Sequence, residues 1–228
     1  MDAADRFREL VRAPGPDVRL DDAALCIAAR AQPGLDVDAW CARLDELAAE
    51  CSAPSFDAVL EELFVRRGFV GATDDYADPR NSFLDAVLER RRGIPISLSV
   101  VVIEVARRLG VVVHGVGMPG HFLVQAAGAE DIWCDPFAGG ALLDVDGCRA
   151  RFDALFRGER VLHPRDLAPT PPRAILARML ANLEQGPLGR DPRAQEWLYE
   201  LHLSIPGVSD GDRAVLERKL TRVRAGWN

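Results

Sequence analysis

Three polar residues of the 228-residue chain occur in local patterns that could support nucleophilic catalysis. Ser97 follows a Gly-Ile-Pro-Ile turn and opens an apolar helical stretch, whose free backbone N–H groups would favour a developing anion. His121 follows a Pro-Gly turn at the start of one apolar strand, and Asp135 ends the next. If those strands pair, the Asp135 carboxylate can hold the His121 imidazole in one tautomer. Ser97, His121 and Asp135 therefore predict a hydrolase or acyltransferase triad.

Each of these residues also has a structural interpretation. A serine before an apolar helix is most simply an N-cap, and a lone histidine in a strand is more often a satisfied structural group. Asp135 could merely begin the Asp-Pro-Phe turn. His121 and Asp135 could also act together as an acid/base pair without a nucleophile. Spacing alone leaves these interpretations open.

A metal site is a weaker alternative. His114, His121, Cys134 and Asp135 come from the same group of predicted strands. Successive residues of a strand point to opposite faces, so Cys134 and Asp135 diverge. Too few ligands would then face one way for a zinc site. We expect neither a metal nor another cofactor.

The elements that must position these residues follow an α+β order, with helices, a short antiparallel sheet and then further helices. Helical spacing of apolar residues indicates helices within 20–34, 35–51, 56–68, 82–90 and 97–110. β-branched and apolar runs between glycine-rich turns indicate strands within 111–118, 121–128, 131–137 and 140–145. Helical spacing returns within 144–158, 172–186, 191–205 and 210–226.

The proline-rich stretch 163–173 is the best candidate for a boundary. We expect a domain over residues 1–165 that contains the leading helices, and a C-terminal helical region over 166–228. The last two helices could be a remnant of a helical repeat, and one such pair must pack on the core to bury its apolar face. Asn81, just before the helix at 82–90, is expected to cap that helix.

Composition excludes several classes of function. The net charge of −7 argues against nucleic-acid binding, which needs a cationic surface. Glu104 interrupts the longest apolar run, so no membrane span is expected, and the acidic N-terminus lacks the apolar core of a signal peptide. The five cysteines (Cys26, Cys41, Cys51, Cys134 and Cys148) form no CxxC pair. We expect reduced, mostly buried thiols in a cytoplasmic protein.

Three motifs carry a family resemblance. The stretch from "NSFLDAVLERRRGIPISLS" to "PGHFLV", then "DPFAGGALL" and "RAILARMLANLE", resembles the SirB1-type branch of the transglutaminase-like superfamily over about residues 20–185. The resemblance implies a papain-like fold, with a catalytic cysteine at the N-terminus of a central helix packed on an antiparallel sheet. His121 and Asp135 correspond to the superfamily's catalytic histidine and aspartate. In longer members of this branch, tetratricopeptide-like helices follow.

The catalytic cysteine is missing from this pattern. A gap-free alignment through Leu109-Gly110 places the cysteine position on Pro95, and no cysteine lies between Cys51 and Cys134. The usual thiolate–imidazolium mechanism cannot operate from this helix. The resemblance therefore implies a pseudoenzyme that binds an unknown protein or peptide partner through the cleft around His121 and Asp135. The alternative is a hydrolase or acyltransferase that uses Ser97 as its nucleophile.

Overall fold

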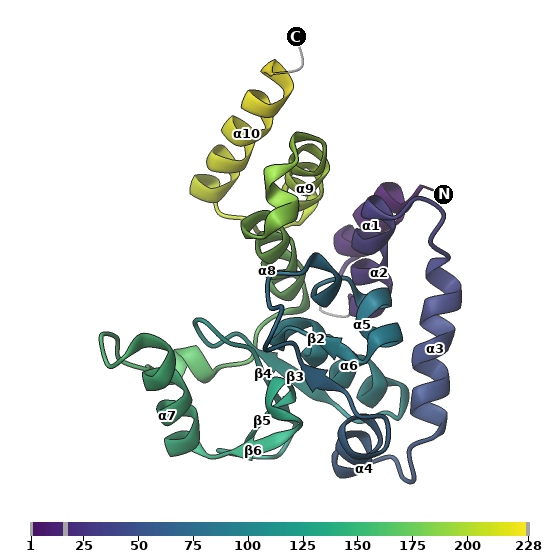
Figure 1. Cartoon of the computed structure of the whole chain (residues 1–228), viewed down its shortest axis with the longest axis vertical. Helices are drawn as coiled ribbons and strands as arrows, with labels where there is room; N and C mark the ends of the chain where they lie inside the picture. The colour runs from purple at the N-terminus through teal and green to yellow at the C-terminus, as the bar shows by residue number, and fades with distance from the viewer. Residues whose placement is uncertain (1, 16–17, 227–228) are drawn as a thin grey trace.

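The computed structural model describes residues 2–15 and 18–226, and a small sheet lies between helices of the two halves of the chain (Figure 1). The first half contains α1 (Ala3–Arg12), α2 (Leu20–Ala31), α3 (Val37–Ala49), α4 (Phe56–Leu60), α5 (Leu84–Arg90) and α6 (Pro95–Arg108). A meander follows, of β3 (Val113–Val116), β4 (Leu123–Ala126), β5 (Trp133–Asp135) and β6 (Ala141–Leu143). The second half contains α7 (Val145–Phe156), α8 (Pro172–Gln185), α9 (Pro192–Ser204) and α10 (Asp210–Ala225). This order confirms the predicted α+β class.

Short elements join these larger ones. A π-helical segment, η1 (Glu61–Arg66), continues α4, so the predicted helix at 56–68 is two helical types in succession. β1 (Val70–Gly71) and β2 (Arg92–Gly93) form a separate parallel pair. The 3-10 turns are η2 (Pro79–Asn81), η3 (Pro136–Ala138), η4 (Pro164–Leu167) and η5 (Pro187–Arg190). Within the described residues, no helix combines the length and apolar content needed to cross a bilayer.

Helix α6 is the centre of the fold. Every residue from Pro95 to Ala106 is buried, as expected for a helix that is apolar on all sides. It packs against α2, α3, α4 and α5 and against β3 and β4 of the sheet. It also packs against η3, which follows directly after β5, and Gly71 of β1 pairs with Gly93 just before α6 and lies against Phe137 of η3. The start of α6 and the end of β5 are therefore brought together.

The sheet is antiparallel in the order β3-β4-β5-β6 and buries both faces. Val124 and Cys134 belong to the main apolar cluster with α6, while Leu123 and Trp133 belong to a second cluster with Phe152 of α7. The register pairs Val124 with Cys134. The strand pairing that the catalytic interpretation requires is therefore present.

The C-terminal helices share the main core. Leu180 of α8 and Leu198 of α9 lie in the same apolar cluster as Phe7 and Val11 of α1. Of the last two helices, α9 packs on the core as expected, whereas α10 packs chiefly against α9. The division between 1–165 and 166–228 stays a prediction.

The segment 163–173 lies along the outer edge of β3. The Thr170 N–H donates to the carbonyl oxygen of Gly115 at 2.7 Å, and the Gly117 N–H donates to the Thr170 hydroxyl at 2.8 Å. Pro169 forms a bridge to Val116. The stretch predicted as a boundary is thus held against the sheet at these points.

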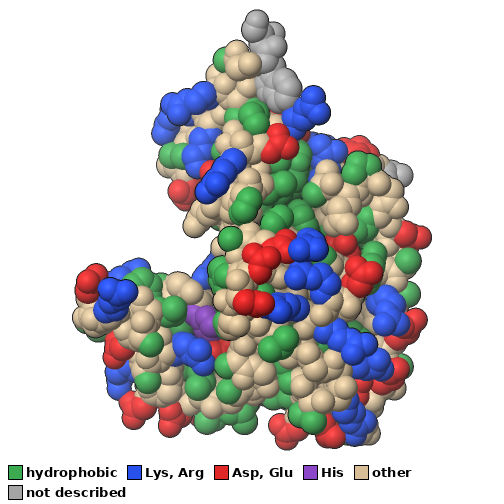
Figure 2. Space-filling model, in the orientation of Figure 1, with side chains coloured by type: hydrophobic (Ala, Val, Ile, Leu, Met, Phe, Trp, Pro, Cys, Tyr) green, Lys and Arg blue, Asp and Glu red, His purple; other side chains and the backbone are tan. Residues whose placement is uncertain are grey.

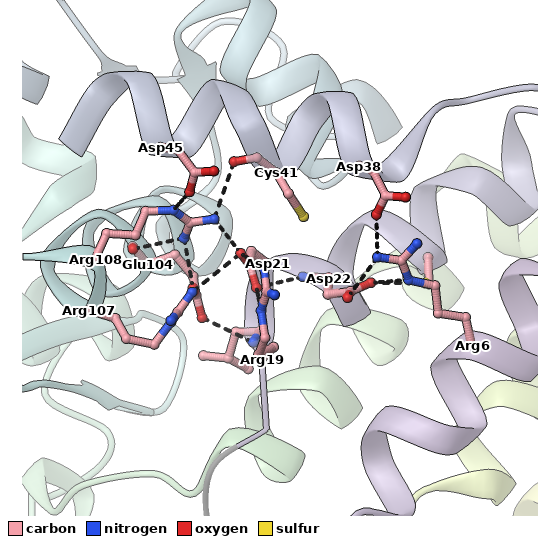
Figure 3. A network of polar contacts seen from close by, with 12 residues as sticks. Arg6, Arg19, Asp21, Asp22, Asp38, Cys41, Asp45, Glu104, Arg107 and Arg108 are labelled. Carbon is pink, nitrogen blue, oxygen red and sulfur yellow. Dashed lines mark hydrogen bonds and ion pairs between the residues drawn. The ribbon is translucent and has the colours of Figure 1, made fainter. Parts of the chain in front are cut away.

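A network of buried charges joins the C-terminal end of α6 to α2 and α3 (Figure 3). The Arg108 guanidinium lies 2.6 Å from Asp21 and 3.1 Å from Glu104, and both carboxylates are almost completely buried. It also reaches Asp45 on α3 at 2.6 Å. Glu104 accepts a hydrogen bond from the Leu20 N–H at 3.0 Å. Members of this network are up to 87 residues apart in the sequence, so local patterns do not indicate it.

Candidate functional site

His121 and Asp135 form a buried pair. The His121 Nε2 lies 2.9 Å from Asp135 Oδ2, and the two residues are 5% and 0% exposed. Asp135 ends β5, as predicted, while His121 precedes β4 in the turn that follows Gly120. Because a carboxylate only accepts hydrogen bonds, Nε2 carries the proton and Nδ1 is left as an acceptor in neutral imidazole. The structure therefore brings these two predicted residues together.

Asp135 is held on both of its oxygens. Oδ1 accepts from the N–H groups of Phe137 at 3.0 Å and Ala138 at 3.2 Å, which fixes the carboxylate at the start of η3. Oδ2 is shared between His121 and the Arg151 guanidinium of α7, which lies 3.0 Å away. Four contacts use all the acceptor positions of a carboxylate. Asp135 therefore orients His121 and has its own charge balanced by Arg151.

Aromatic side chains flank His121. The Phe137 ring meets the imidazole edge-on at a centroid distance of 6.0 Å, and Tyr76 meets Phe137 at the same distance. Phe137 can approach because Gly71 has no side chain: a Cβ there would lie 2.5 Å from the Phe137 carbonyl oxygen. Among the described residues none bonds to His121 Nδ1, and this atom is not sealed from solvent. A hydrogen-bond acceptor beside aromatic rings is thus available to a ligand.

Ser97 makes its hydrogen bonds elsewhere. Its hydroxyl lies 2.6 Å from the carbonyl oxygen of Asn81 and 3.1 Å from that of Ile94, and it accepts from the Ile94 N–H at 3.1 Å. A hydroxyl has one proton to donate, and both candidate acceptors are backbone carbonyls. Ser97 is fully buried at the third position of α6. The structure therefore joins Ser97 to its own helix end and to the loop at Asn81.

Asn81 does not cap α5, so that prediction was wrong. The residue before α5 is Phe83, and no side chain caps the helix. The Asn81 side chain donates to the carbonyl oxygen of Asp75 and accepts from Arg90 at 3.2 Å. Its own carbonyl accepts from Ile94 and Ser97. Asn81 instead fastens the loop that carries Tyr76 to the start of α6.

Pro95 stands at the first position of α6, and the gap-free alignment predicts the superfamily's cysteine at this position. Proline suits this position because the missing N–H would have no partner within the helix. The side chain supplies no nucleophile. The first position of α6 is therefore occupied by a residue that supports the helix and cannot act as a nucleophile.

The native cysteines are poor substitutes for the missing nucleophile. Burial raises the pKa of Cys26, Cys41 and Cys134 to about 12 and that of Cys148 to about 11. Burial also raises the pKa of Cys51. The thiolate is the reactive form, so all five are protonated and weakly reactive at neutral pH.

The residues proposed as metal ligands are not gathered into one cluster. Cys134 faces the core beside α6, whereas Asp135 bonds to Arg151 on the α7 side of the sheet. His114 is exposed on β3. In the parts of the chain that the structure describes, no three His, Cys, Asp or Glu side chains group as a metal site.

Two arginines near His121 were not identified from the sequence. Arg151 bonds to Asp135, and Arg178 of α8 donates to the carbonyl oxygens of His121 at 2.7 Å and Met118 at 3.1 Å. Both come from helices that follow the sheet in the chain. Their helical periodicity was visible, but nothing in it indicates which strand end a given arginine reaches.

Several curated proteins are similar to this chain in sequence. A UPF0162 protein of Xylella fastidiosa is 50% identical over 131 residues, which are 55% of this chain and 46% of that protein. A UPF0162 protein of Pseudomonas aeruginosa is 34% identical over 174 residues, which are 73% of this chain and 64% of that protein. F-box only protein 21 of Mus musculus is 38% identical over 96 residues, 42% of this chain and 14% of that protein.

The chain spans about half the length of the first two Xylella relatives it matches. No solved structure matches it. A model of the transglutaminase-like superfamily matches residues 34–181, a range that includes α6, the whole sheet and the His121–Asp135 pair. The chain belongs to the transglutaminase-like superfamily.

Proposed function

We propose that this chain is a SirB1-type member of the superfamily that has no catalytic nucleophile and binds a protein or peptide at the His121–Asp135 cleft. The observation that carries the proposal is the position of the Ser97 hydroxyl, which lies 2.6 Å from the Asn81 carbonyl oxygen in a fully buried site. A serine needs a base within hydrogen-bond reach to become a nucleophile. Pro95, at the position predicted for the superfamily's cysteine, has no nucleophilic atom in its side chain.

The cleft keeps features that suit binding. The His121 Nδ1 accepts hydrogen bonds, and the rings of Phe137 and Tyr76 offer apolar contact beside it. Aromatic surface next to a few fixed polar groups is typical of ligand sites. The alternative, a hydrolase with a Ser97-His121-Asp135 triad, is favoured by one observation, the 2.9 Å pair between His121 and Asp135.

Serine-directed labelling distinguishes the two functions. We expect a fluorophosphonate probe to label the wild-type chain no more than Ser97→Ala or His121→Ala, because the Ser97 hydroxyl has no base to activate it. Intact-protein mass spectrometry measures the adduct. A fluorophosphonate adduct on wild type that disappears in both variants would establish the triad and overturn the pseudoenzyme proposal.

Binding at the cleft is tested separately on an array of immobilised peptides. We expect His121→Ala to lose the peptides that wild type retains, since it removes the accessible acceptor Nδ1. His114→Ala is the matched control, because His114 is exposed on β3 away from Asp135. Equal retention by wild type and His121→Ala would place binding elsewhere and contradict the proposed site.

A further inference from the structure

A groove lies between α8 and α10, next to the His121 loop. Its volume is about 790 Å³, and its walls are one face of α8, the turn after α9 and the facing side of α10. We call it the α8–α10 groove. Figure 2 shows the molecule hollowed on the side where α10 stands away from α7 and the sheet. Arg178 lines the groove, and its guanidinium also donates to the His121 carbonyl. The groove therefore reaches the His121 loop at this residue.

The walls of the groove are mostly small or apolar. On α8 they are Ala174, Ala177 and Ala181, which lie on one face of the helix because they are three and four residues apart. Val215 and Leu216 stand opposite on α10. Small side chains on one wall let a bound chain approach the α8 backbone, and the opposite wall offers contact to aliphatic groups.

Arg178 is a cation without a counter-ion in this groove. Within residues 2–15 and 18–226, no carboxylate lies at ion-pair distance from its guanidinium, whose partners are the carbonyls of Met118 and His121. The Phe122 ring lies 5.3 Å beneath it. Burial lowers the pKa of Arg178, which shows that its charge is poorly solvated. A partly desolvated cation gains most from an incoming anion.

The guanidinium has donors left for such an anion. Its Nη2 makes both hydrogen bonds to carbonyls, whereas Nε and Nη1 have no partner among the described residues and are not sealed from solvent. The two carbonyls and the Phe122 ring hold the guanidinium in place before a ligand arrives. Planar guanidinium groups bind carboxylates through paired hydrogen bonds.

The acidic residues that line the groove are already engaged. Glu184 pairs with Lys219, and Asp212 accepts from the Ser209 hydroxyl at 2.7 Å. We infer that the α8–α10 groove binds a peptide segment that places a carboxylate side chain, flanked by aliphatic side chains, on Arg178. This inference rests on the proposed function, because it identifies the partner of the His121 cleft as an acidic peptide.

Two peptides that differ only in their central side chain, a carboxylate in one and an amide in the other, test the inference. The probes are acetyl-Ala-Leu-Glu-Leu-Ala-amide and its Gln counterpart, whose capped ends carry no charge. We expect the Glu peptide to bind wild type about tenfold more tightly, the usual effect of a hydrogen-bonded charge pair. NMR titration of the full chain up to millimolar peptide measures both affinities and follows the Arg178 Nε–H signal.

Variants assign the preference to one residue. Arg178→Gln should bring the ratio of the two affinities to about one, and Arg178→Lys should keep part of it. Arg222→Gln, at an exposed position of α10, should retain the full ratio. Because Arg178 also holds two carbonyls, the amide spectra of each variant establish that it is folded.

Several outcomes would overturn the inference. An acidic segment on Arg178 would be excluded by any of three results. These are equal binding of the two peptides by wild type, a preference for Glu that survives Arg178→Gln, and no binding of either peptide. Equal affinities that fall together in His121→Ala would leave the proposed cleft intact while removing the acidic partner. Failure of the inference is thereby distinguished from failure of the proposed function.

Discussion

Replacing Arg108 with Met should lower the free energy of unfolding by about 3–5 kcal/mol, the usual cost of removing one member of a buried ion pair. Asp21 and Glu104 are 0% and 1% exposed, and both lie within 3.1 Å of this guanidinium. Methionine keeps most of the aliphatic volume but removes the cation between two buried carboxylates, which are left with Arg19 and Arg107 only at the edge of the network. Urea denaturation followed by far-UV circular dichroism measures the change.

Arg149→Met is the matched control. Arg149 also pairs with an aspartate, Asp146, at 2.6 Å, but both side chains are exposed to solvent. Exposed ion pairs contribute little, so this variant should unfold at nearly the wild-type urea concentration. If Arg108→Met unfolded at the same urea concentration as Arg149→Met, the buried network would have no net role in stability.

Acid should reduce the effect of Arg108→Met. Burial would raise the pKa of Asp21, but hydrogen bonds from Arg19 and Arg108 outweigh it and hold that pKa at about 2. Asp21 therefore stabilises the wild-type fold above its unfolded pKa, and this contribution is lost as the pH falls towards about 2. Burial, with the nearby Asp21 charge, raises the pKa of Glu104, so ionised Glu104 destabilises the fold and its protonation removes that cost. In the variant, protonation of either carboxylate relieves the repulsion between Asp21 and Glu104, which Arg108 no longer screens, and the loss of stability should be smaller at about pH 5 than at about pH 7.

Pro95→Cys should create a thiol whose reactivity depends on His121. An unperturbed thiol is only a few per cent ionised at neutral pH, whereas a helix N-terminus and a neighbouring histidine shift it largely to thiolate. We expect alkylation by iodoacetamide to be about 10–30-fold faster than in Pro95→Cys/His121→Ala. The native cysteines give a low background because burial raises their pKa values. Mass spectrometry of the alkylated chain over time measures the rate.

Pro95→Cys/His114→Ala controls for a general effect of losing a histidine, and it should react as fast as Pro95→Cys alone. Urea denaturation of each variant establishes that the proline replacement leaves the fold intact. Alkylation at the same rate with and without His121 would show that the two positions do not face each other. The gap-free alignment of Pro95 with the superfamily's cysteine would then be incorrect.

Local patterns in the sequence were enough to predict most of the elements. The helical spacing that identified α6 and α8, and the glycine-bounded strands that identified β4 and β5, reflect side chains that bury one face or all faces. The His121–Asp135 pair followed from the adjacency of two strands. Such patterns depend on neighbours in the chain, which is why they could be read directly.

Some features were missed although a signal was present. Ala4, Phe7 and Val11 are the buried face of α1, with spacings of three and four residues, but the N-terminal stretch was considered only as a signal peptide. Asn81 has the residue type of a cap, yet it is the last residue of the 3-10 turn η2, and the helix starts only at Leu84. Local composition could not show that its partners were Asp75 and Arg90.

Other features could not be predicted, because they depend on distant contacts. Arg151 and Arg178 reach the His121–Asp135 pair from helices that come after the sheet. Arg108 meets Asp21 across 87 positions of sequence. Helical periodicity gives the face on which an arginine lies and does not give its partner, so the electrostatic surroundings of the cleft required the structure.

The packing of α10 has a consequence for how a ligand would be held. Leu216 is its one described side chain that is buried, and the helix rests chiefly on α9, whereas α8 contributes five buried residues to the structure. The α8–α10 groove thus has one wall that belongs to the main core and one wall attached to it through α9 and the Lys219–Glu184 pair. A segment that contacts both walls would add to the few contacts that hold α10 against α8, so its binding should stabilise the position of α10.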